Sequence, residues 1–461
     1  MSYLSAMQIS ASGLQAQQTV LEVAGNNIAN VNTPGYHRQE AVLNAVSLAP
    51  ATPQGVPTNA VLGSGVDVTT IQRLQSQYLT QQQQQTTGQM SYWNAQQNAL
   101  SQAQSVLEPS ATTDLSTQLN SFFSAWQQLA NSPGDATSRT TVVYAAQQVA
   151  TTLNSNATYL NQTNNALLAQ EGTDVQSLNS MATQLATLNG QISQANGSGI
   201  ADNNLLDQRD TLTQQMAGLA GVTVTTAANG TAMVNLGGHQ MVSGTTTHVL
   251  TLDSSSGSPK LTWDDGTSAQ IPNGEIAGLE NTRGSVLSGF SAKYDALASA
   301  LSSAVNTQYA AGVKPNGQPA GAFFTGTTAG TLQVSAAILA DPSQVAAGAT
   351  ANAPGDGSVA SAIANLANQP LIGASTVQQG ASALVGQIGT SVQNAQNMVN
   401  TTQAVQDQLT SQQQSVSGVS LDEELTNMMT AQQAYDASAR VMTTADQMMQ
   451  SLLSTIQTIA A

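Results

Sequence analysis

The segment 421–456 is the feature that most constrains what this chain can fold into. Its apolar positions follow steps that alternate between four and three residues without interruption. This spacing is a heptad period, which allows one helix to wind around another. The predicted seam consists of Leu421, Leu425, Met428, Gln432, Tyr435, Ala439, Met442, Asp446, Met449, Leu453 and Ile456.

The first thirty residues carry a second stripe with the same spacing. This N-terminal stripe consists of Leu4, Met7, Ala11, Leu14, Gln18, Leu21, Gly25 and Ile28. Polar residues within the stripes, such as Gln432 and Asp446, help to fix the register at some cost in stability. Stripes this narrow leave a lone helix marginally stable in water. We therefore hypothesise that both ends are mobile in the free chain and fold only against neighbouring helices.

The composition excludes several classes of function. The 461-residue chain has 9 basic and 25 acidic residues, which gives a formal net charge of −16. A chain so poor in Lys and Arg is a poor candidate for binding nucleic acid or anionic lipid. It contains no cysteine, which excludes disulfides and thiolate metal sites. Because no apolar run approaches the ~18 residues of a membrane span, we expect no membrane insertion. The first basic residue is Arg38, too late for the positive region of a cleavable signal peptide.

The periodicity predicts a mainly α protein with an inserted small β domain. Helical periods occupy long stretches before and after residues 221–275. Within this segment, β-rich runs are separated by the pairs Asn229-Gly230, Gly237-Gly238 and Asp265-Gly266, which are typical of hairpin turns. Since the helical material comes first and last, the chain ends should meet. We expect a rod with terminal coiled-coil helices, a long-helix bundle core and a β head.

We expect three domains in this rod. Residues 1–70 and 416–461 form the terminal coiled-coil domain, residues 71–220 and 276–415 form the helical core with a loop-rich segment at 312–357, and residues 221–275 form the small β domain.

Several local features carry further expectations. A short strand is expected near 66–68, with helix from Ile71 onward. The run Gln81–Gln85 should be a solvated helical face. An aromatic group that includes Phe122 and Trp126 should pack in the core. Asp135 is a plausible N-cap for the long helix that follows.

The sequence offers few candidates for catalysis or metal binding. The three histidines, His37, His239 and His248, lack the spacing of a metal site, and His37 is expected to be exposed beside a turn. Asp207 and Asp210 lie one helical turn apart, and paired carboxylates can perform acid–base chemistry. A structural ion pair at a domain joint is the favoured interpretation. We therefore predict no catalytic residue, no metal and no cofactor.

The string GNNIANVNTPGY at residues 25–36 ends the first predicted helix. Its asparagines compete with the backbone for hydrogen bonds, which favours a helix end. Pro34-Gly35 is a turn pair, and Thr33 before proline is disfavoured in the α region. We define the motif as Asn26, Asn27, Ile28, Ala29, Asn30, Asn32, Thr33, Pro34, Gly35 and Tyr36.

This motif resembles the N-terminal signature of the bacterial flagellar axial proteins, which comprise rod, hook and hook-associated proteins. Three further stretches resemble the hook-associated protein 1 family of the hook–filament junction. They are NLLDQRD at 204–210, QQQSVSGVSLDEE at 412–424 and QQAYDASARVMTTAD at 432–446. Together with the long helices between them, the resemblance covers nearly the whole chain.

The resemblance implies a structural, non-enzymatic part of the flagellum outside the cell. Such proteins are exported unfolded by the flagellar type III apparatus, and they form a ring of identical subunits on the hook tip. The ring connects the hook protein to the second junction protein and so to the filament. Residues 1–70 and 416–461 match the helices of the inner tube, and the ten motif residues are expected to serve assembly.

The resemblance also implies that a cytosolic export chaperone binds residues 421–456. The candidate chaperone-binding residues are Leu421, Leu425, Met428, Tyr435, Met442, Met449, Leu453 and Ile456. The region 221–357 is shorter than in many relatives, which implies that an outer β subdomain is reduced or absent.

Three alternatives remain open at this point. A hook or distal rod protein would share the motif, although NLLDQRD and the long helical core speak against it. A secreted adhesin or phage-tail-like fibre would explain the polar composition but not the motif paired with two heptad stripes. An enzyme such as a glycan hydrolase would need a carboxylate pair in a cleft.

Overall fold

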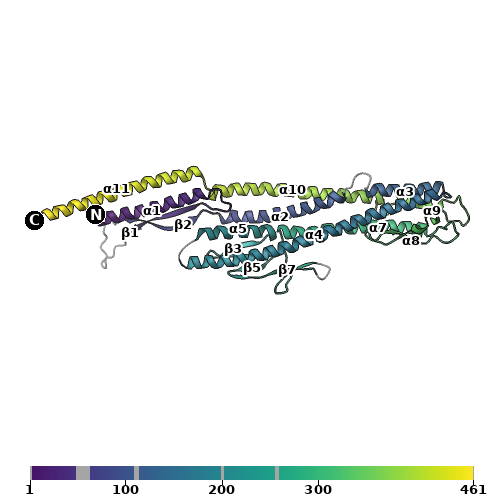
Figure 1. Ribbon diagram of the computed structural model, residues 1–461, viewed down its shortest axis with the longest axis horizontal. Coiled ribbons are helices and arrows are strands. Elements are labelled where there is room, and N and C mark those ends of the chain that lie inside the picture. Colours follow the sequence, from purple (N-terminus) through teal and green to yellow (C-terminus); the bar gives the residue numbers. More distant parts are fainter. Residues whose placement is uncertain (1–2, 48–62, 108–113, 199–201, 255–258, 460–461) are drawn as a thin grey trace.

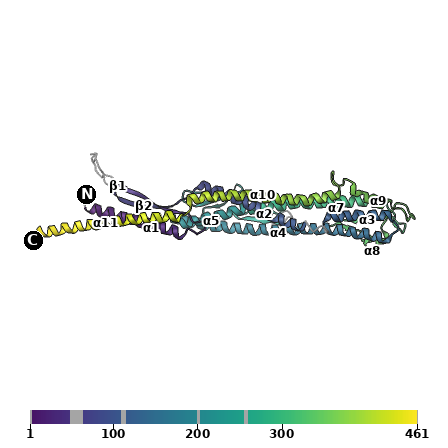
Figure 2. The same ribbon diagram turned by 90° about the horizontal axis from the view of Figure 1, so that it is seen from above.

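A computed structural model of the chain describes residues 3–47, 63–107, 114–198, 202–254 and 259–459. The molecule is a long, narrow rod that is mainly helical, and both chain termini lie at the same end (Figures 1 and 2). Among the described residues, no helix combines the length and apolar character needed to span a bilayer.

The two ends of the chain pair with each other. Helix α1 (Tyr3–Ala29) runs beside helix α11 (Leu421–Ile459) in the opposite direction. A Cβ on Gly13 would lie 3.1 Å from Ser438 Oγ, so small residues let the two helices approach closely. The C-terminal part of α11 continues past the beginning of α1 (Figure 1).

A β-hairpin packs against the other side of α1. Strand β1 (Gln39–Ser47) pairs antiparallel with β2 (Gly63–Arg73), and Ser12 Oγ of α1 accepts a hydrogen bond from Val66 N at 3.2 Å. The expected helix start at Ile71 is wrong, because Ile71 pairs with Ala41 and α2 (Gln77–Leu107) begins six residues later. The β-branched residues before Arg73 favour the strand.

Long helices build the rod. Helix α3 (Leu115–Asn131) leads into α4 (Ala136–Gly197), which is 62 residues long, and α5 (Asn203–Ala220) follows. The predicted cap of α4 is confirmed, since the Asp135 carboxylate accepts hydrogen bonds from the backbone N–H groups of Thr137 and Ser138. Helix α10 (Val377–Ser417) returns along the rod toward the chain ends (Figure 1).

The strands after α5 pack on α4 and form the proximal core with it. Strands β3 (Thr223–Thr226), β4 (Ala232–Leu236), β5 (His239–Ser243) and β6 (Thr246–Thr247) form one antiparallel sheet in that order. Strands β7 (Leu250–Asp253) and β8 (Lys260–Trp263) form a separate pair. The buried residues of this proximal core include Val175, Leu178, Met216, Val234 and Trp263.

Asparagines of α4 fix these strands by bonding to their backbone. Asn189 Nδ2 donates to Ala232 O, and Ala232 N donates to Asn189 Oδ1, both at 2.8 Å. Asn179 binds the N–H and C=O groups of Leu250 in the same way, at 3.0 and 2.7 Å. These paired bonds satisfy the backbone groups of Ala232 and Leu250 that point toward α4.

The distal core lies at the far end of the rod. Helix α6 (Gly274–Asn281), the π-helical turn η1 (Thr282–Leu287) and α7 (Ser288–Tyr309) lead to it. The predicted packing of Phe122 and Trp126 is confirmed, because both side chains are fully buried. Trp126 packs edge-on against Phe323, with ring centroids 5.2 Å apart.

The segment 312–357 contains only short elements among irregular turns. They are β9 (Phe324–Thr325), β10 (Gln333–Val334), α8 (Ala336–Ala340) and the 3-10 turn η2 (Pro342–Gln344), and α9 (Ser358–Asn365) with the 3-10 turn η3 (Leu366–Asn368) follows.

The expectation of a solvated glutamine face on α2 is partly wrong. Gln84 is buried, and its Nε2 donates to Thr213 Oγ1 of α5 at 3.2 Å. A long side chain can bury its stem against a neighbouring helix while its amide finds a polar partner.

Candidate functional site

The motif forms the last turn of α1 and the loop that follows it. This loop lies where α1, the hairpin, α5 and the link between α10 and α11 meet (Figure 1). We call this region the joint, and define it as residues 26–38 together with the side chains of Arg73, Asp207, Asp210 and Glu424.

Asn27 holds three segments of the joint together. Its side chain is 1% exposed, and its Oδ1 accepts from Gln39 N at 2.9 Å and from the Tyr36 hydroxyl at 2.8 Å. Its Nδ2 donates to Gln39 O at 2.9 Å and to Glu424 Oε2 at 3.1 Å. A single amide thus ties the end of α1 to the start of β1 and of α11, with its hydrogen-bonding capacity fully used.

The other motif residues shape the loop itself. Asn30 Nδ2 donates to Asn26 Oδ1 at 2.8 Å, and Thr33 Oγ1 donates to Asn30 Oδ1 at 3.1 Å. Burial, followed by the charges of Asp207 and Glu424, raises the pKa of Tyr36 to about 12, so its hydroxyl remains a donor. Within the motif, Ala29, Asn32, Thr33, Pro34 and Gly35 lie exposed, while Ile28 is half-buried.

Gly35 is required by both its conformation and its surroundings. Its φ is +79°, a left-handed conformation that side chains with a Cβ rarely adopt. A Cβ at this position would lie 2.5 Å from Thr211 Oγ1 of α5. The turn can therefore rest directly on α5.

An ion-pair cluster binds the hairpin and loop to α5. Asp207 Oδ1 accepts from Arg73 at 2.6 Å and from His37 Nδ1 at 2.8 Å, and Arg73 also reaches Asp210 at 2.9 Å. Arg209 pairs with Asp210 at 2.6 Å. Both carboxylates are thus used in structural pairs, as the favoured interpretation of the sequence proposed.

The expectation that His37 is exposed is wrong. Its side chain is 13% exposed because it lies against Asp207. Sequence reasoning also missed Arg73, whose two carboxylate partners lie more than 130 residues away along the chain. No local pattern links these residues, because the fold brings them together.

Arg38 connects the joint to the beginning of α11. Its guanidinium donates to Glu424 at 2.7 Å and to Glu423 at 3.0 Å, and its backbone N–H donates to Ser417 O at 3.0 Å. The link between α10 and α11 is therefore fixed from both sides. Charge-assisted bonds to a buried carboxylate such as Glu424 are among the stronger polar contacts.

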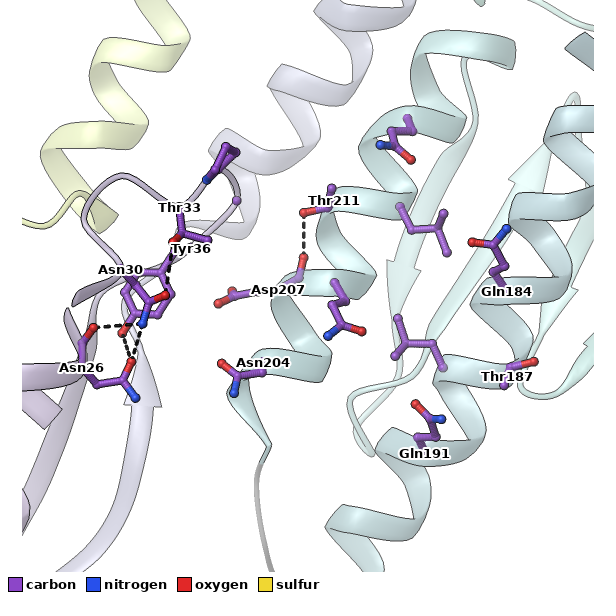
Figure 3. A pocket seen from close by; sticks show the side chains of 16 residues that line it. Asn26, Asn30, Thr33, Tyr36, Gln184, Thr187, Gln191, Asn204, Asp207 and Thr211 are labelled. Carbon is purple, nitrogen blue, oxygen red and sulfur yellow. Dashed lines mark hydrogen bonds between the residues drawn. The ribbon is translucent and has the colours of Figure 1, made fainter. Parts of the chain in front are cut away.

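A trough of about 860 Å³ opens beside the loop. Asn26, Asn30 and Tyr36 line one side, α5 contributes residues such as Asp207, and Gln184 of α4 lies on the opposite side (Figure 3). The lining is rich in carboxamides and hydroxyls, which can recognise a polypeptide backbone or other polar groups.

The face of α11 that lies against α1 keeps one row of the predicted seam, and it replaces the row of Leu425, Gln432 and Asp446 by the residues one position earlier. Glu424, Ala431 and Ala445 are buried on this face, with Met428 and Met442 half-buried between them. On its flank, Leu425 is 52% exposed and Leu453 is 56% exposed.

The remaining seam residues lie on the α1 face or on its flank. Tyr435, Leu421, Gln432 and Asp446 are exposed, and Ala439 and Met449 are half-buried. The side chain of Ile456 lies outside the described residues.

The N-terminal stripe lies mostly at the edges of the contacts that α1 makes. Gln18 is exposed and the side chain of Leu4 lies outside the described residues, while the half-buried members are Met7, Ala11, Leu14, Leu21, Gly25 and Ile28. The buried residues of α1 are Ser10, Ala16, Val23, Ala24 and Asn27.

The two other histidines lie together at the surface near β8. His239 stacks on Trp263 with ring centroids 4.3 Å apart and contacts Asp265, while His248 contacts Asp264 at 3.1 Å. Within the described ranges, no group of three or more His, Asp or Glu side chains is arranged to hold a metal ion.

Three family models match different parts of the chain. Residues 100–324 match the flagellar hook-associated protein FlgK helical domain. Residues 7–37 match the flagella basal body rod protein family, and residues 410–455 match the flagellar basal body rod FlgEFG protein C-terminal family.

The chain is similar over its length to characterised proteins. It is 28% identical to flagellar hook-associated protein 1 of Bacillus subtilis, over 95% of this chain and 96% of that protein. It is 30% identical to flagellar hook-associated protein 1 of Escherichia coli, over 68% of this chain and 58% of that protein. The aligned part is thus less than two thirds of the Escherichia coli relative.

A solved structure has the same fold over most of the rod. The structure of the flagellar hook junction protein FlgK from Burkholderia pseudomallei matches with a TM-score of 0.65 and 18% identity. The match covers 73% of this chain and 100% of the solved chain.

Proposed function

Because the chain belongs to the flagellar hook-associated protein 1 family, we propose that it is a structural subunit of the junction between hook and filament. Identical copies assemble as a ring on the hook tip, and the ring connects the hook protein to the second junction protein. The protein acts outside the cell as part of the flagellum.

The surface of α11 is the observation that carries this proposal. Leu421, Leu425, Val441, Met448 and Leu453 are all more than two fifths exposed although they belong to one long helix. Helix α1 covers one face of α11 and leaves these residues uncovered, and α11 extends beyond it (Figure 1). Leu425 and Leu453 share one heptad position on one flank of α11, and Val441 and Met448 share another on the opposite flank. Exposed apolar residues on both flanks of a helix mark an interaction surface. In the ring, the terminal helices of neighbouring copies cover it and form the inner tube.

The joint positions the terminal helices on the rod in this assembly. Asn27 and Arg38 bind Glu424 at the start of α11, while Asp207 of α5 binds His37 and Arg73. A firm joint fixes the angle at which the paired helices leave the rod. Each copy would then present the same surface to its neighbours.

Before assembly, the same apolar surface is available to other partners. We propose that a cytosolic export chaperone binds residues 421–456 and that the type III export apparatus then secretes the chain unfolded. The absence of cysteine places no covalent cross-link in the way of such export.

We infer that the protein works without catalysis. The best carboxylate pair of the sequence, Asp207 and Asp210, is bound by Arg73 and Arg209 at distances of 2.6–2.9 Å. Carboxylates engaged in this way serve the joint, which supports the structural role over a glycan hydrolase.

Deletion of the gene, followed by electron microscopy of the cells, tests the junction role. We expect hooks without filaments, with filament protein released into the medium, because the filament then lacks its attachment. Cells that lack hooks altogether would instead indicate a rod or hook protein. Cells with normal filaments would contradict any role at the junction.

A further inference from the structure

The interior of the rod is divided into two separate apolar cores that share one helix. Leu160 and Leu167 of α4 belong to the distal core, whereas Val175 and Leu178 of the same helix belong to the proximal core. The boundary between them therefore crosses α4 within the interval 168–174. Apolar burial holds each side together but does not continue through this interval.

Buried charged groups occupy the boundary. Glu171 is 0% exposed and Asp174 is 5% exposed. Arg283 Nε of η1 donates to Glu171 Oε2 at 3.1 Å, and Gln170 Nε2 donates to Asp174 Oδ1 at 2.8 Å. The other oxygens, Glu171 Oε1 and Asp174 Oδ2, are buried and accept no hydrogen bond from the described residues. Leaving ionised oxygens buried without a donor destabilises this arrangement, in which the layer is closed to water.

Negative charge exceeds positive charge at this layer. Burial, followed by the charge of Glu275 on α6, raises the pKa of Asp174 from 3.8 to about 6. Burial also raises the pKa of Glu171 against the opposing effect of Arg283, and Glu280 adds to the rise.

The neighbouring elements α6, α2 and β7 contain no Lys or Arg among their described residues. Burial raises the pKa of Glu275 itself. Helix α2 contains no charged residue, and Asp253 of β7 lies opposite Lys260 in its own strand pair. Arg283 forms its ion pair with Glu171 alone among the described carboxyl groups of this layer, at 3.1 Å.

The backbone is also irregular at this level. The six residues of η1 are π-helical and separate α6 from α7. Such segments interrupt the regular hydrogen-bond pattern of an α-helix and are frequent at functional sites. Next to them, Gly278 lets α6 approach α2 so closely that a Cβ would lie 2.5 Å from Tyr92 O. Helix α6 is therefore fixed to α2, and η1 is the place where the path of the chain can change.

We propose that the layer formed by Glu171, Asp174 and Arg283 is a pH-sensitive hinge between the distal and proximal parts of the rod. When Asp174 is ionised, the boundary favours arrangements that admit water, and the two parts move relative to each other. When Asp174 is protonated, its negative charge is lost. The boundary then excludes water, and the two parts stay fixed relative to each other.

The direction of the pH effect follows from linkage. The pKa of Asp174 is higher in the closed rod than the ordinary value of 3.8. The closed state therefore binds protons more tightly, and it is fully favoured below about pH 4. This advantage is lost as the pH rises through about 6. The proposal concerns a single chain, so it stands independently of the role at the junction.

Hydrogen exchange of the purified full-length chain tests the proposal. After correction for the intrinsic exchange rate, we expect amides near Glu171 and in η1 to be about tenfold better protected at about pH 5 than at about pH 7.5. Asp174→Asn should give high protection at both values, because the group can no longer ionise.

A matched control separates burial from simple neutralisation. Asp407 of α10 accepts from Gln403 Nε2 at 2.8 Å, the same four-residue contact that Gln170 makes to Asp174, but Asp407 is exposed. Asp407→Asn should therefore leave the pH response of the layer unchanged. Glu275→Gln should move the midpoint of the response to lower pH, because it removes a negative charge near Asp174.

Movement between the two parts can be measured directly. The cysteine-free chain allows spin labels at Thr151→Cys in α4 and Gln240→Cys in β5, on opposite sides of the layer. We expect a broad distance distribution at about pH 7.5 that narrows at about pH 5, and a narrow one at both values in Asp174→Asn. Equal distributions and equal corrected protection at both pH values would overturn the proposal, as would a full pH response in Asp174→Asn.

Discussion

At the scale of single residues, the joint depends on side chains that come from distant parts of the sequence. The Asn27 amide meets Glu424 across 397 positions of sequence, and Arg73 meets Asp207 across 134. The sequence predicted the loop at Pro34-Gly35 and the cap at Asp135, because these depend on near neighbours. It could not predict the burial of His37, which depends on where α5 lies.

Gly35 allows a test of the joint that spares the rest of the fold. Replacing Pro34 and Gly35 by Ala removes the fixed turn and places a Cβ at a φ of +79° against Thr211. We expect a local cost of roughly 1–3 kcal/mol and weaker swimming. The full-length variant should keep the unfolding temperature of the rod, residues 71–415, almost unchanged when it is measured by circular dichroism.

Gly386→Ala is the matched control for this substitution. It lies within α10, where an added Cβ would meet no atom within 4 Å. Ala is the better helix former there, so stability should rise by about 0.5–1 kcal/mol with normal swimming. Unchanged swimming of the Pro34 and Gly35 variant would show that the turn does not serve assembly.

At the scale of elements, helices were easier to predict than strands. The heptad and helical periods indicated α4 and α10, because a long amphipathic helix repeats its signal many times. In place of the hairpin of β1 and β2, only a short strand near 66–68 was predicted. Neither face of β2 is consistently buried, so its sequence lacks a clear alternation of apolar and polar residues. The break at η1 was not anticipated at all, because the apolar residues continue across it.

The loop-rich segment 312–357 has an unexpected part in the distal core. Phe323 is fully buried among Phe122, Trp126 and Tyr309 although its segment has little regular structure. Phe323→Ala should therefore destabilise the distal part by about 3–5 kcal/mol. Chemical denaturation followed by tryptophan fluorescence, to which Trp93 and Trp263 also contribute, measures the change.

The neighbouring Leu339 provides the comparison, because it lies in α8 and is 40% exposed. Leu339→Ala should shift the same transition by about 1 kcal/mol or less. If the two substitutions had equal effects, Phe323 would not be part of the core that holds this end together.

At the scale of the whole molecule, the chain is a rod whose terminal helices leave apolar residues exposed in a single copy. The rod is built from two apolar cores, and the joint sets the paired terminal helices upon it (Figure 2). The sequence predicted the meeting of the ends from the order of helical and β-rich segments. Which face of α11 the first helix covers could not be predicted, since two overlapping heptad registers run along the same helix.

The most direct measurement concerns Leu425 and Leu453, which lie four heptads apart on the uncovered flank of α11. Since both are more than half exposed, replacing them by Ser should change the unfolding free energy of the purified chain by no more than about 0.5 kcal/mol. Met429 is unsuitable as a control because it lies one helical turn from Leu425. Val405→Ser in α10, at a residue that is 47% exposed, serves as the control.

Electron microscopy of cells that carry these variants then counts filaments on hooks, while immunoblots of the medium establish that each variant is exported. In exported protein, the Leu425 and Leu453 variant should fold normally but leave hooks without filaments, whereas Val405→Ser supports filaments. Loss of export would instead indicate the chaperone-binding role of the same two residues. Filaments in normal number on cells with the double variant would contradict the claim that neighbouring copies cover this flank.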